Sequence, residues 1–185
     1  SIVFCTSTAG LEWKKFKREQ NKVVHSKTWE EVQEVTKKLA SSAPATFAYM
    51  YSKRCLSQFI CEQSVEFAKM GIRMNNVLPA STDTGMKQEF QDMVGSEEGL
   101  IAQAGLAGRL ATSEEMAYPM VFLNSDMASF VSGLDMVVDY TDTCLKVLGK
   151  KKNLEAVSAT NPIICALAKK MLNKSAKNAL NSGNE

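Results

Sequence analysis

The sequence has no run of roughly eighteen consecutive apolar residues, which a membrane-crossing helix needs. It also lacks the charged start and apolar middle of a secretory signal peptide. Neither sign of charge dominates, since 22 basic and 20 acidic side chains leave a net charge of +2. We therefore expect no membrane partner and no nucleic-acid partner.

Residues that bind metals are scarce. The chain has one histidine, His25, and none of its five cysteines forms a Cys-x-x-Cys pair, so we expect no zinc site. A serine hydrolase is also disfavoured, because there is no Gly-x-Ser-x-Gly turn and His25 lies in a charged segment where solvent should surround it. Unpaired, widely spaced cysteines are typical of a reduced, cytoplasmic protein with buried thiols.

The length of 185 residues and the apolar content of 45% are sufficient for one globular domain with a sizeable core. The chain opens at Ser1, without a methionine and directly inside an apolar run. From this start we expect an upstream portion of the protein to be absent from the sequence.

Three short apolar segments predict the strands of a parallel sheet. Residues 1–7 are almost continuously apolar and β-branched, as in a strand that is buried on both faces. Residues 72–79 and 132–139 predict two more strands. Between the first two, residues 46–70 repeat apolar positions at helical spacing, and Gly71 is suited to end that helix. Strand, helix and strand in this order predict a right-handed crossover and an α/β fold.

Further helices are predicted by their end signals. A surface helix over 28–40 begins with a threonine and two glutamates, which favour a helix start. Thr112 and Glu115 have the spacing of a capping box at the start of another helix. A loop that becomes helical is expected over 80–95, and a last amphipathic helix near 162–180.

Polar side chains follow two of the predicted strands. Ser7 follows the first strand, and a run that includes Thr82 and Thr84 follows the second. The carboxyl ends of parallel strands open at one edge of the sheet, where ligands bind in folds of this kind. The alternative is that these hydroxyls only shape turns.

Tyr49 and Lys53 are one helical turn apart on the predicted crossover helix. Their Cβ atoms should lie about 5–6 Å apart on one face. A nearby ammonium stabilises a phenolate, so Lys53 should lower the pKa of Tyr49 from its usual value near 10. Such a pair could donate a proton to a substrate, although spacing alone favours an ordinary surface pair.

Four segments in register carry a resemblance to a known family. They are Ser7 in VFCTSTAG, Tyr49-x-x-x-Lys53, the RMNNVLPASTDTGM segment and the final SDMASFVSGLDMVVD run. Over residues 1–139 the sequence resembles the short-chain dehydrogenases/reductases. The resemblance implies a Rossmann-like doubly wound parallel sheet, with only its C-terminal half in this chain. Residues 1–140 would then be the C-terminal part of the dehydrogenase domain, followed by a helical tail over 141–185.

The resemblance also implies roles for individual residues. In such an enzyme Ser7 holds the substrate carbonyl oxygen, Tyr49 donates the proton, and Lys53 lowers the tyrosine pKa and reaches the cofactor ribose. The cofactor would be NAD or NADP, and the reaction a reversible hydride transfer between a ketone and a secondary alcohol. The residues implied to bind the cofactor are Tyr49, Lys53, Pro79, Ala80, Thr82 and Thr84.

The sequence departs from the family pattern at several places. Residues 11–42 form an insertion between the serine and the tyrosine, similar to that of bacterial 3α-hydroxysteroid dehydrogenase/carbonyl reductase relatives. This insertion points to a hydroxysteroid or another bulky carbonyl as substrate. Ala80 stands where the family has glycine, and Asp139-Tyr140-Thr141 replaces its Asp-Gly-Gly.

A rival interpretation is a non-catalytic remnant or interaction module that keeps part of the fold. The sequence upstream of Ser1 would separate the two, since a glycine-rich nucleotide-binding turn there favours the enzyme. A half-sheet that starts at its own central strand exposes unpaired backbone, so we expect the isolated chain neither to fold stably nor to bind cofactor. Helices 46–70 and 112–126 match elements at subunit contacts in the family, which implies a homo-oligomer.

Overall fold

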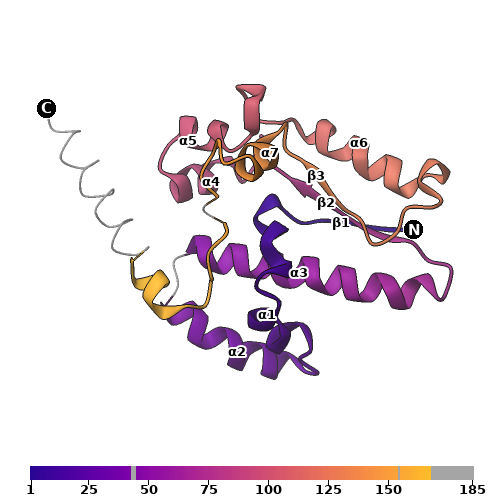
Figure 1. Cartoon of the computed structure of the whole chain (residues 1–185), viewed down its shortest axis with the longest axis horizontal. Helices are drawn as coiled ribbons and strands as arrows, with labels where there is room; N and C mark the ends of the chain where they lie inside the picture. Colours follow the sequence, from indigo (N-terminus) through magenta and orange to yellow (C-terminus); the bar gives the residue numbers. More distant parts are fainter. Residues whose placement is uncertain (43–44, 154, 168–185) are drawn as a thin grey trace, which may run out of the picture.

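A three-stranded parallel sheet forms the centre of the molecule (Figure 1). The computed structural model describes residues 1–42, 45–153 and 155–167. The strands, in spatial order, are β1 (Ile2–Cys5), β2 (Met74–Pro79) and β3 (Asp135–Val138). Cys5 lies opposite Val77 and Pro79 opposite Val138, so the carboxyl ends of all three strands open at one edge. The predicted parallel α/β sheet is confirmed.

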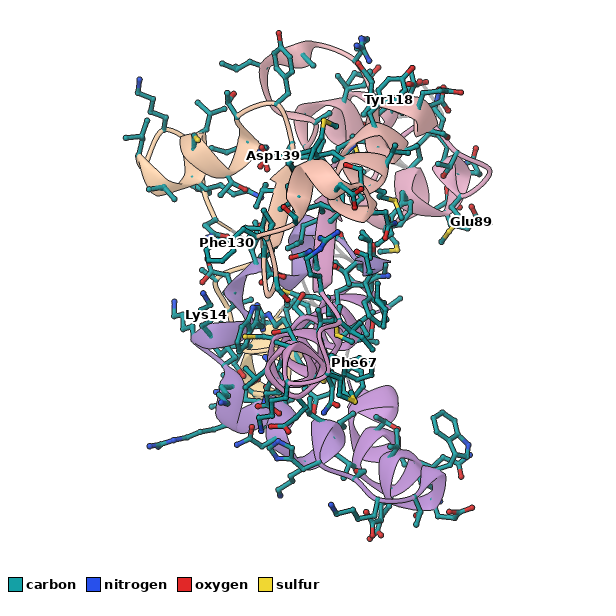
Figure 2. All side chains as sticks on the ribbon, turned by 90° about the vertical axis from the view of Figure 1, so that its right-hand side faces the viewer. Lys14, Phe67, Glu89, Tyr118, Phe130 and Asp139 are labelled. Atoms are coloured by element: carbon teal, nitrogen blue, oxygen red, sulfur yellow. The ribbon has the colours of Figure 1, made fainter. Side chains whose placement is uncertain are left out.

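Two helices cover the two faces of the sheet. The crossover helix α3 (Ala45–Ala68) lies on one face and α6 (Ser113–Asn124) on the other (Figures 1 and 2). Between α6 and the sheet, Val77, Leu123 and Ala128 are fully buried in one apolar cluster. The order β1, α3, β2 is the strand–helix–strand unit that the sequence predicts.

The helix ends follow the sequence signals. Gly71, just after α3, has a φ of 73°, the left-handed conformation that glycine adopts without a steric penalty. At the start of α6 the Thr112 side chain accepts from the Glu115 N–H, and the Glu115 carboxylate accepts from the Thr112 N–H at 2.8 Å. The predicted capping box is therefore confirmed.

Several shorter helices complete the chain. Within the described residues, no helix is both long and apolar enough to cross a membrane. Residues 162–167 are helical, and the rest of the helix predicted over 162–180 lies outside the described residues. The remaining elements are η1 (Thr8–Lys14), α1 (Lys17–Val24), α2 (Trp29–Ser42), α4 (Lys87–Val94), α5 (Glu97–Ala102), η2 (Gly105–Ala107), η3 (Asp126–Ala128) and α7 (Asp142–Val147).

The insertion folds back on the crossover helix. Helices α1 and α2 lie on the side of α3 that faces away from the sheet (Figure 1). The Tyr51 hydroxyl donates to the Glu19 carbonyl at 2.9 Å, which ties α3 to α1. His25, which we expected in solvent, has a side chain that is 56% exposed and also lies 2.9 Å from the Glu62 carboxylate. These contacts hold the insertion against α3, which leads the chain back to the sheet.

The prediction of buried thiols is wrong for two of the five cysteines. Cys55 and Cys165 are buried, whereas Cys5 and Cys144 are exposed. Cys5 ends the edge strand β1, and Cys144 lies on the short surface helix α7. An apolar strand ending at the sheet edge therefore does not imply burial of its last side chain.

Candidate active site

Ser7 lies at the carboxyl end of β1, where the chain turns into η1. Its backbone is extended, and its Oγ accepts a hydrogen bond of 3.2 Å from the Ala9 N–H. Ser7 is thus the N-cap of η1, which satisfies an N–H that the helix start would leave unpaired. This cap fixes the Ser7 hydroxyl at the edge where the strands end.

Tyr49 and Lys53 project from the first turns of α3 toward the same edge. The Lys53 ammonium lies over the Tyr49 ring, 5.3 Å from its centroid. The Ser7 hydroxyl lies near the Tyr49 hydroxyl, close enough to lower the pKa of that phenol. The structure therefore brings together the three side chains that the resemblance marks as catalytic, from segments more than forty positions apart in the sequence.

The pKa of Tyr49 is raised above its ordinary value, and the largest cause is burial of the phenol. The Ser7 hydroxyl lowers this pKa, and the nearby Cys5 thiol raises it. The expected net lowering by Lys53 is therefore wrong, because burial disfavours the phenolate more than its surroundings favour it. At neutral pH Tyr49 is consequently protonated, as a proton donor must be.

Two neighbours of Tyr49 were not predicted. Although the Cys5 side chain is exposed, neighbouring atoms partly desolvate its thiol and raise its pKa, and the Lys53 charge lowers that pKa, which places Cys5 near Lys53. Since side chains two apart on a strand share a face, the spacing of Cys5 and Ser7 could have revealed this. The Phe90 ring of α4 packs edge-on against Tyr49, with centroids 5.5 Å apart and an interplanar angle of 79°. No sequence signal links Phe90 to Tyr49.

The loop after β2 is held by hydrogen bonds within the loop and to neighbouring segments. Ala80 N–H donates to the Val138 carbonyl at 3.0 Å, and the Thr82 hydroxyl donates to the Ala80 carbonyl at 2.9 Å. The exposed Thr84 hydroxyl accepts from the Met86 N–H at 3.3 Å. In the part of the chain that the structure describes, Thr82 and Thr84 thus bond within their own loop rather than to Tyr49.

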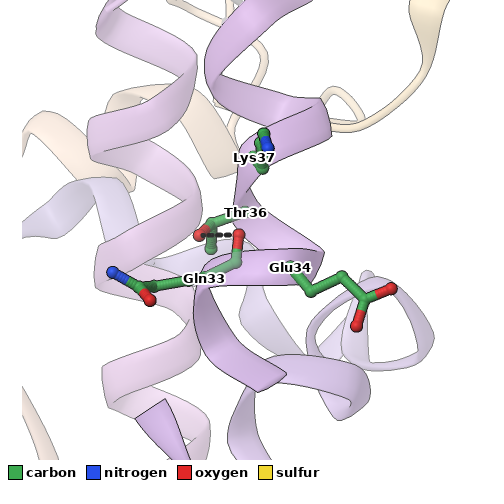
Figure 3. A pocket seen from close by; sticks show the side chains of 4 residues that line it. All are labelled: Gln33, Glu34, Thr36 and Lys37. Atoms are coloured by element: carbon green, nitrogen blue, oxygen red, sulfur yellow. Dashed lines mark hydrogen bonds between the residues drawn. The ribbon is translucent and has the colours of Figure 1, made fainter. Parts of the chain in front are cut away.

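Two surface hollows lie away from the candidate catalytic side chains. One surface hollow, of about 540 Å³, lies on α2 and is lined by Gln33, Glu34, Thr36 and Lys37 (Figure 3). A second, of about 500 Å³, lies between the insertion and α3 and is mostly apolar. Neither is lined by Ser7, Tyr49 or Lys53, so neither is the candidate active site.

Comparison with known proteins identifies the family. A family model described as enoyl-(acyl carrier protein) reductase, a short-chain dehydrogenase model, matches residues 34–140, more than half of the chain. The chain belongs to the short-chain dehydrogenase/reductase family. The matched range contains Tyr49, Lys53 and the loop from Pro79 to Thr84.

Related proteins in this family carry several dehydrogenase names. The chain is 38% identical over 97 residues to cyclopentanol dehydrogenase of Comamonas sp. (strain NCIMB 9872), covering 52% of this chain and 38% of that protein. It is 35% identical over 99 residues to 2,3-dihydro-2,3-dihydroxybenzoate dehydrogenase of Escherichia coli (strain K12), covering 50% of this chain and 40% of that protein. The chain thus spans two-fifths or less of these relatives.

A solved structure shares the fold. The 3-alpha-hydroxysteroid dehydrogenase from Pseudomonas sp. B-0831, complexed with NADH, superposes with a TM-score of 0.62 at 20% identity. The match covers 82% of this chain and 57% of the other. It supports the Rossmann-like arrangement of the sheet and its helices, and at this identity it carries no statement about substrate.

Proposed function

We propose that the protein to which this chain belongs, called the natural protein below, is an NAD(P)-dependent oxidoreductase that interconverts a ketone and a secondary alcohol. The observation that supports this function most is the convergence of Ser7, Tyr49 and Lys53 at the carboxyl edge of the sheet. Membership of the dehydrogenase family makes that convergence a candidate catalytic centre instead of a chance surface cluster.

Each of the three side chains has a distinct role in this proposal. The Tyr49 hydroxyl, protonated at neutral pH, gives its proton to the carbonyl oxygen during reduction and takes it back during oxidation. The Ser7 hydroxyl, which lies near the Tyr49 hydroxyl, holds that oxygen in place. The Lys53 ammonium stabilises negative charge that develops on the phenol oxygen.

The residues at the edge fit the nicotinamide end of NAD or NADP. Lys53 offers a cationic donor for ribose hydroxyls, and the exposed Thr84 hydroxyl can donate to a carboxamide while it accepts from Met86. Pro79, Ala80 and Thr82 would line the same side. When bound, the nicotinamide supplies or accepts the hydride. Ala80 adds a methyl group where the family has glycine, which narrows the expected pocket.

For the substrate we propose a bulky carbonyl of the hydroxysteroid type. The support is the insertion over 11–42, which resembles that of hydroxysteroid dehydrogenase/carbonyl reductase relatives. Cyclopentanol, which gives a similar protein its name, is the smaller alternative substrate. The two define a useful test panel because they differ in size and share a secondary alcohol.

We also propose that the natural protein is a homo-oligomer. The outer side of α6 and the turn after it expose large apolar side chains. They are Tyr118, Val121, Met127 and Phe130, each at least 66% exposed, and Figure 2 labels two of them. Clustered exposed apolar side chains mark interaction surfaces, and α6 corresponds to the helix that the resemblance places at subunit contacts.

The first test is nicotinamide-dependent turnover by the natural protein. We expect NAD(P)-dependent oxidation of a hydroxysteroid, followed by nicotinamide absorbance. Tyr49→Phe should lower kcat by about 10²–10⁴-fold, because general acid–base catalysis contributes that much. Lys53→Met should also lower kcat strongly.

Lys69→Met serves as the matched control for Lys53→Met, since Lys69 is exposed and follows the far end of α3. It should keep the kcat of the unsubstituted protein. A folded natural protein that converts neither panel substrate with NAD or NADP, or a Tyr49→Phe variant with full activity, would favour the non-catalytic interaction module instead.

A further inference from the structure

Arg54 is a fully buried charged residue in the helix that carries the candidate catalytic pair. It directly follows Lys53 and is 0% exposed. Its guanidinium donates to the Val157 carbonyl at 3.0 Å and to the Glu155 carbonyl. These acceptors lie about a hundred positions further along the chain, so Arg54 ties α3 to the segment that follows α7.

The same guanidinium is also held by apolar and sulfur groups. It stacks on the Phe16 ring, 4.4 Å from the centroid, and one nitrogen lies 3.2 Å from Met50 Sδ. Stacking of this kind is favourable and most effective when both groups are desolvated. Because Phe16 lies two residues after the end of η1, Arg54 is placed between the end of η1 and the C-terminal segment.

The C-terminal strap, residues 151–159 apart from 154, also contacts η1 directly. Asn153 Nδ2 donates to Glu12 Oε1 at 2.6 Å, and the Lys15 ammonium, just after η1, donates to the Ala156 carbonyl at 3.3 Å. The strap runs from α7 past the N-terminal end of α3 (Figure 1). It therefore touches both elements that meet at the candidate active site.

Both ends of the C-terminal strap are anchored. Near α7, Lys146 pairs with Glu155 at 2.6 Å, and Lys151 pairs with the buried Asp142. Further along, Ala159 is fully buried in an apolar cluster with residues of α3. Fixed ends allow the segment between them to hold the carbonyls that Arg54 binds.

Alignment of η1 with α3 decides the geometry of the candidate site, because Ser7 caps η1 while α3 carries Tyr49 and Lys53. The two elements approach so closely that a Cβ on Gly10 would lie 3.0 Å from the Lys53 carbonyl oxygen. We propose that Arg54 is a positioning residue that uses the C-terminal strap to hold η1 against α3, and thereby Ser7 against Tyr49. The inference rests on the proposed function for its catalytic consequence only.

The test compares Arg54→Met and Arg54→Lys in the natural protein, with Arg18→Met as the matched control. Arg18 is an exposed arginine on α1. Methionine keeps an apolar stem without donors, and lysine keeps the charge with one donating nitrogen. Three readouts are needed. They are kcat and KM, amide hydrogen exchange over 8–14 and 155–159, and the pKa of Tyr49. The titration of Tyr49 is isolated by subtracting the tyrosinate absorbance of the same variant with Tyr49→Phe added.

For Arg54→Met we expect kcat to fall by about 10²-fold, with KM nearly unchanged, because small misplacements of catalytic groups have effects of that size. Hydrogen exchange should become faster over both ranges together. The pKa of Tyr49 should rise, since the nearby Ser7 hydroxyl that lowers it moves away. Arg54→Lys should recover part of each effect, and Arg18→Met should change none.

Two results would overturn the inference. One is an Arg54→Met protein with unchanged exchange over 8–14 and an unchanged Tyr49 pKa. The other is lower stability with an unchanged kcat per folded molecule, which would make Arg54 a purely structural residue. If the natural protein has no dehydrogenase activity, the proposed function fails, while the exchange and titration readouts still decide the positioning role.

Discussion

At the scale of single residues, the Ser7 hydroxyl opposes the effect of burial on the pKa of Tyr49, the candidate proton donor. Because this hydroxyl lowers the pKa of Tyr49 while burial raises it, Ser7→Ala should raise that pKa further. The sign follows from losing a contact that favours the charged phenolate. Titration of tyrosinate absorbance, corrected with the Tyr49→Phe variant, measures the shift.

Ser129→Ala is a suitable control, because Ser129 is exposed at the end of η3. It should leave the Tyr49 titration unchanged. In the oxidation direction, where the phenolate accepts the proton, the acid limb of the pH–rate profile should move to higher pH in Ser7→Ala. A Tyr49 titration that stays in place, or moves to lower pH, contradicts the assigned role of Ser7.

The turn after β3 keeps a backbone conformation typical of glycine although neither of its residues is glycine. Tyr140 and Thr141 stand where the family has two glycines, and both have positive φ, 43° and 78°. Non-glycine residues adopt this region at a cost in free energy. The Tyr140 carbonyl accepts from the Leu106 N–H at 3.1 Å, in a close approach that requires glycine at position 105. The backbone of the turn thus tolerates the substituted side chains.

The sequence predicted the residues of the candidate site better than their electrostatics. Ser7, Tyr49 and Lys53 were named as site residues because of the family resemblance, while strand ends and helical spacing alone left them as ordinary turn and surface residues. The raised pKa of Tyr49 depends on burial and on the Cys5 thiol, and both arise only in the folded chain, where Phe90 also packs on the phenol ring. The spacing of Tyr49 and Lys53 therefore predicts which side chain lies near the phenol, but it does not predict whether the net pKa shift of Tyr49 is upward or downward.

At the scale of elements, the contact between η1 and α3 can be tested through Gly10. A Cβ at this position would lie 2.7 Å from Ser57 Oγ and 3.0 Å from the Lys53 carbonyl oxygen. Gly10→Ala should therefore force η1 away from α3 and lower the free energy of unfolding by about 1–3 kcal/mol. Urea unfolding of the natural protein measures this change.

Gly85→Ala is the matched control for Gly10→Ala. A Cβ at Gly85 would meet no atom within 4 Å, and its φ is not positive. Its effect should stay within about 0.5 kcal/mol, as for most surface substitutions. Equal stability of the two variants would show that η1 has room to move away from α3 at little cost.

Strong end signals made some elements predictable, and their absence hid others. Helices α3 and α6 have a long apolar period or a capping box, and the structure confirms both. Helix α1 and η1 were missed because the segment from Thr8 to Val24 is mostly polar and has no long repeat of apolar residues at helical spacing. Their stability comes from tertiary contacts, such as the Trp13 indole, which donates to the Asp135 carboxylate at 3.0 Å.

At the scale of the whole molecule, the order of elements was predictable because parallel strands joined by a helix leave few topologies. The sequence did not predict how the chain returns to the sheet after the insertion, because this return depends on the packing of α1 and α2 against α3. That return decides whether Tyr49 lies near Ser7 at all. The family resemblance supplied the expectation, and the packing of the insertion supplies the physical reason.

Strand β1 is an edge of the sheet, and this position bears on the behaviour of the 185-residue chain by itself. Ile2 N–H donates to the Arg73 carbonyl just before β2, and Thr6 N–H donates to the Val77 carbonyl in β2. By alternation, the N–H groups of Val3 and Cys5 point to the open side. Open N–H and C=O groups on an edge strand pair readily with another chain. We therefore expect the isolated chain to self-associate, to unfold without one cooperative transition, and not to bind NADPH.

Sedimentation, urea unfolding and calorimetric titration with NADPH, all under reducing conditions, test this expectation. Cys5→Pro removes one outward N–H and should reduce self-association, because proline cannot donate to a new ladder. Cys5→Ser is its matched control: it removes the thiol, keeps the N–H, and should associate like the unsubstituted chain. A monomeric chain that unfolds in one cooperative step and binds NADPH tightly would refute the expectation, and would show that residues 1–185 contain a complete cofactor site.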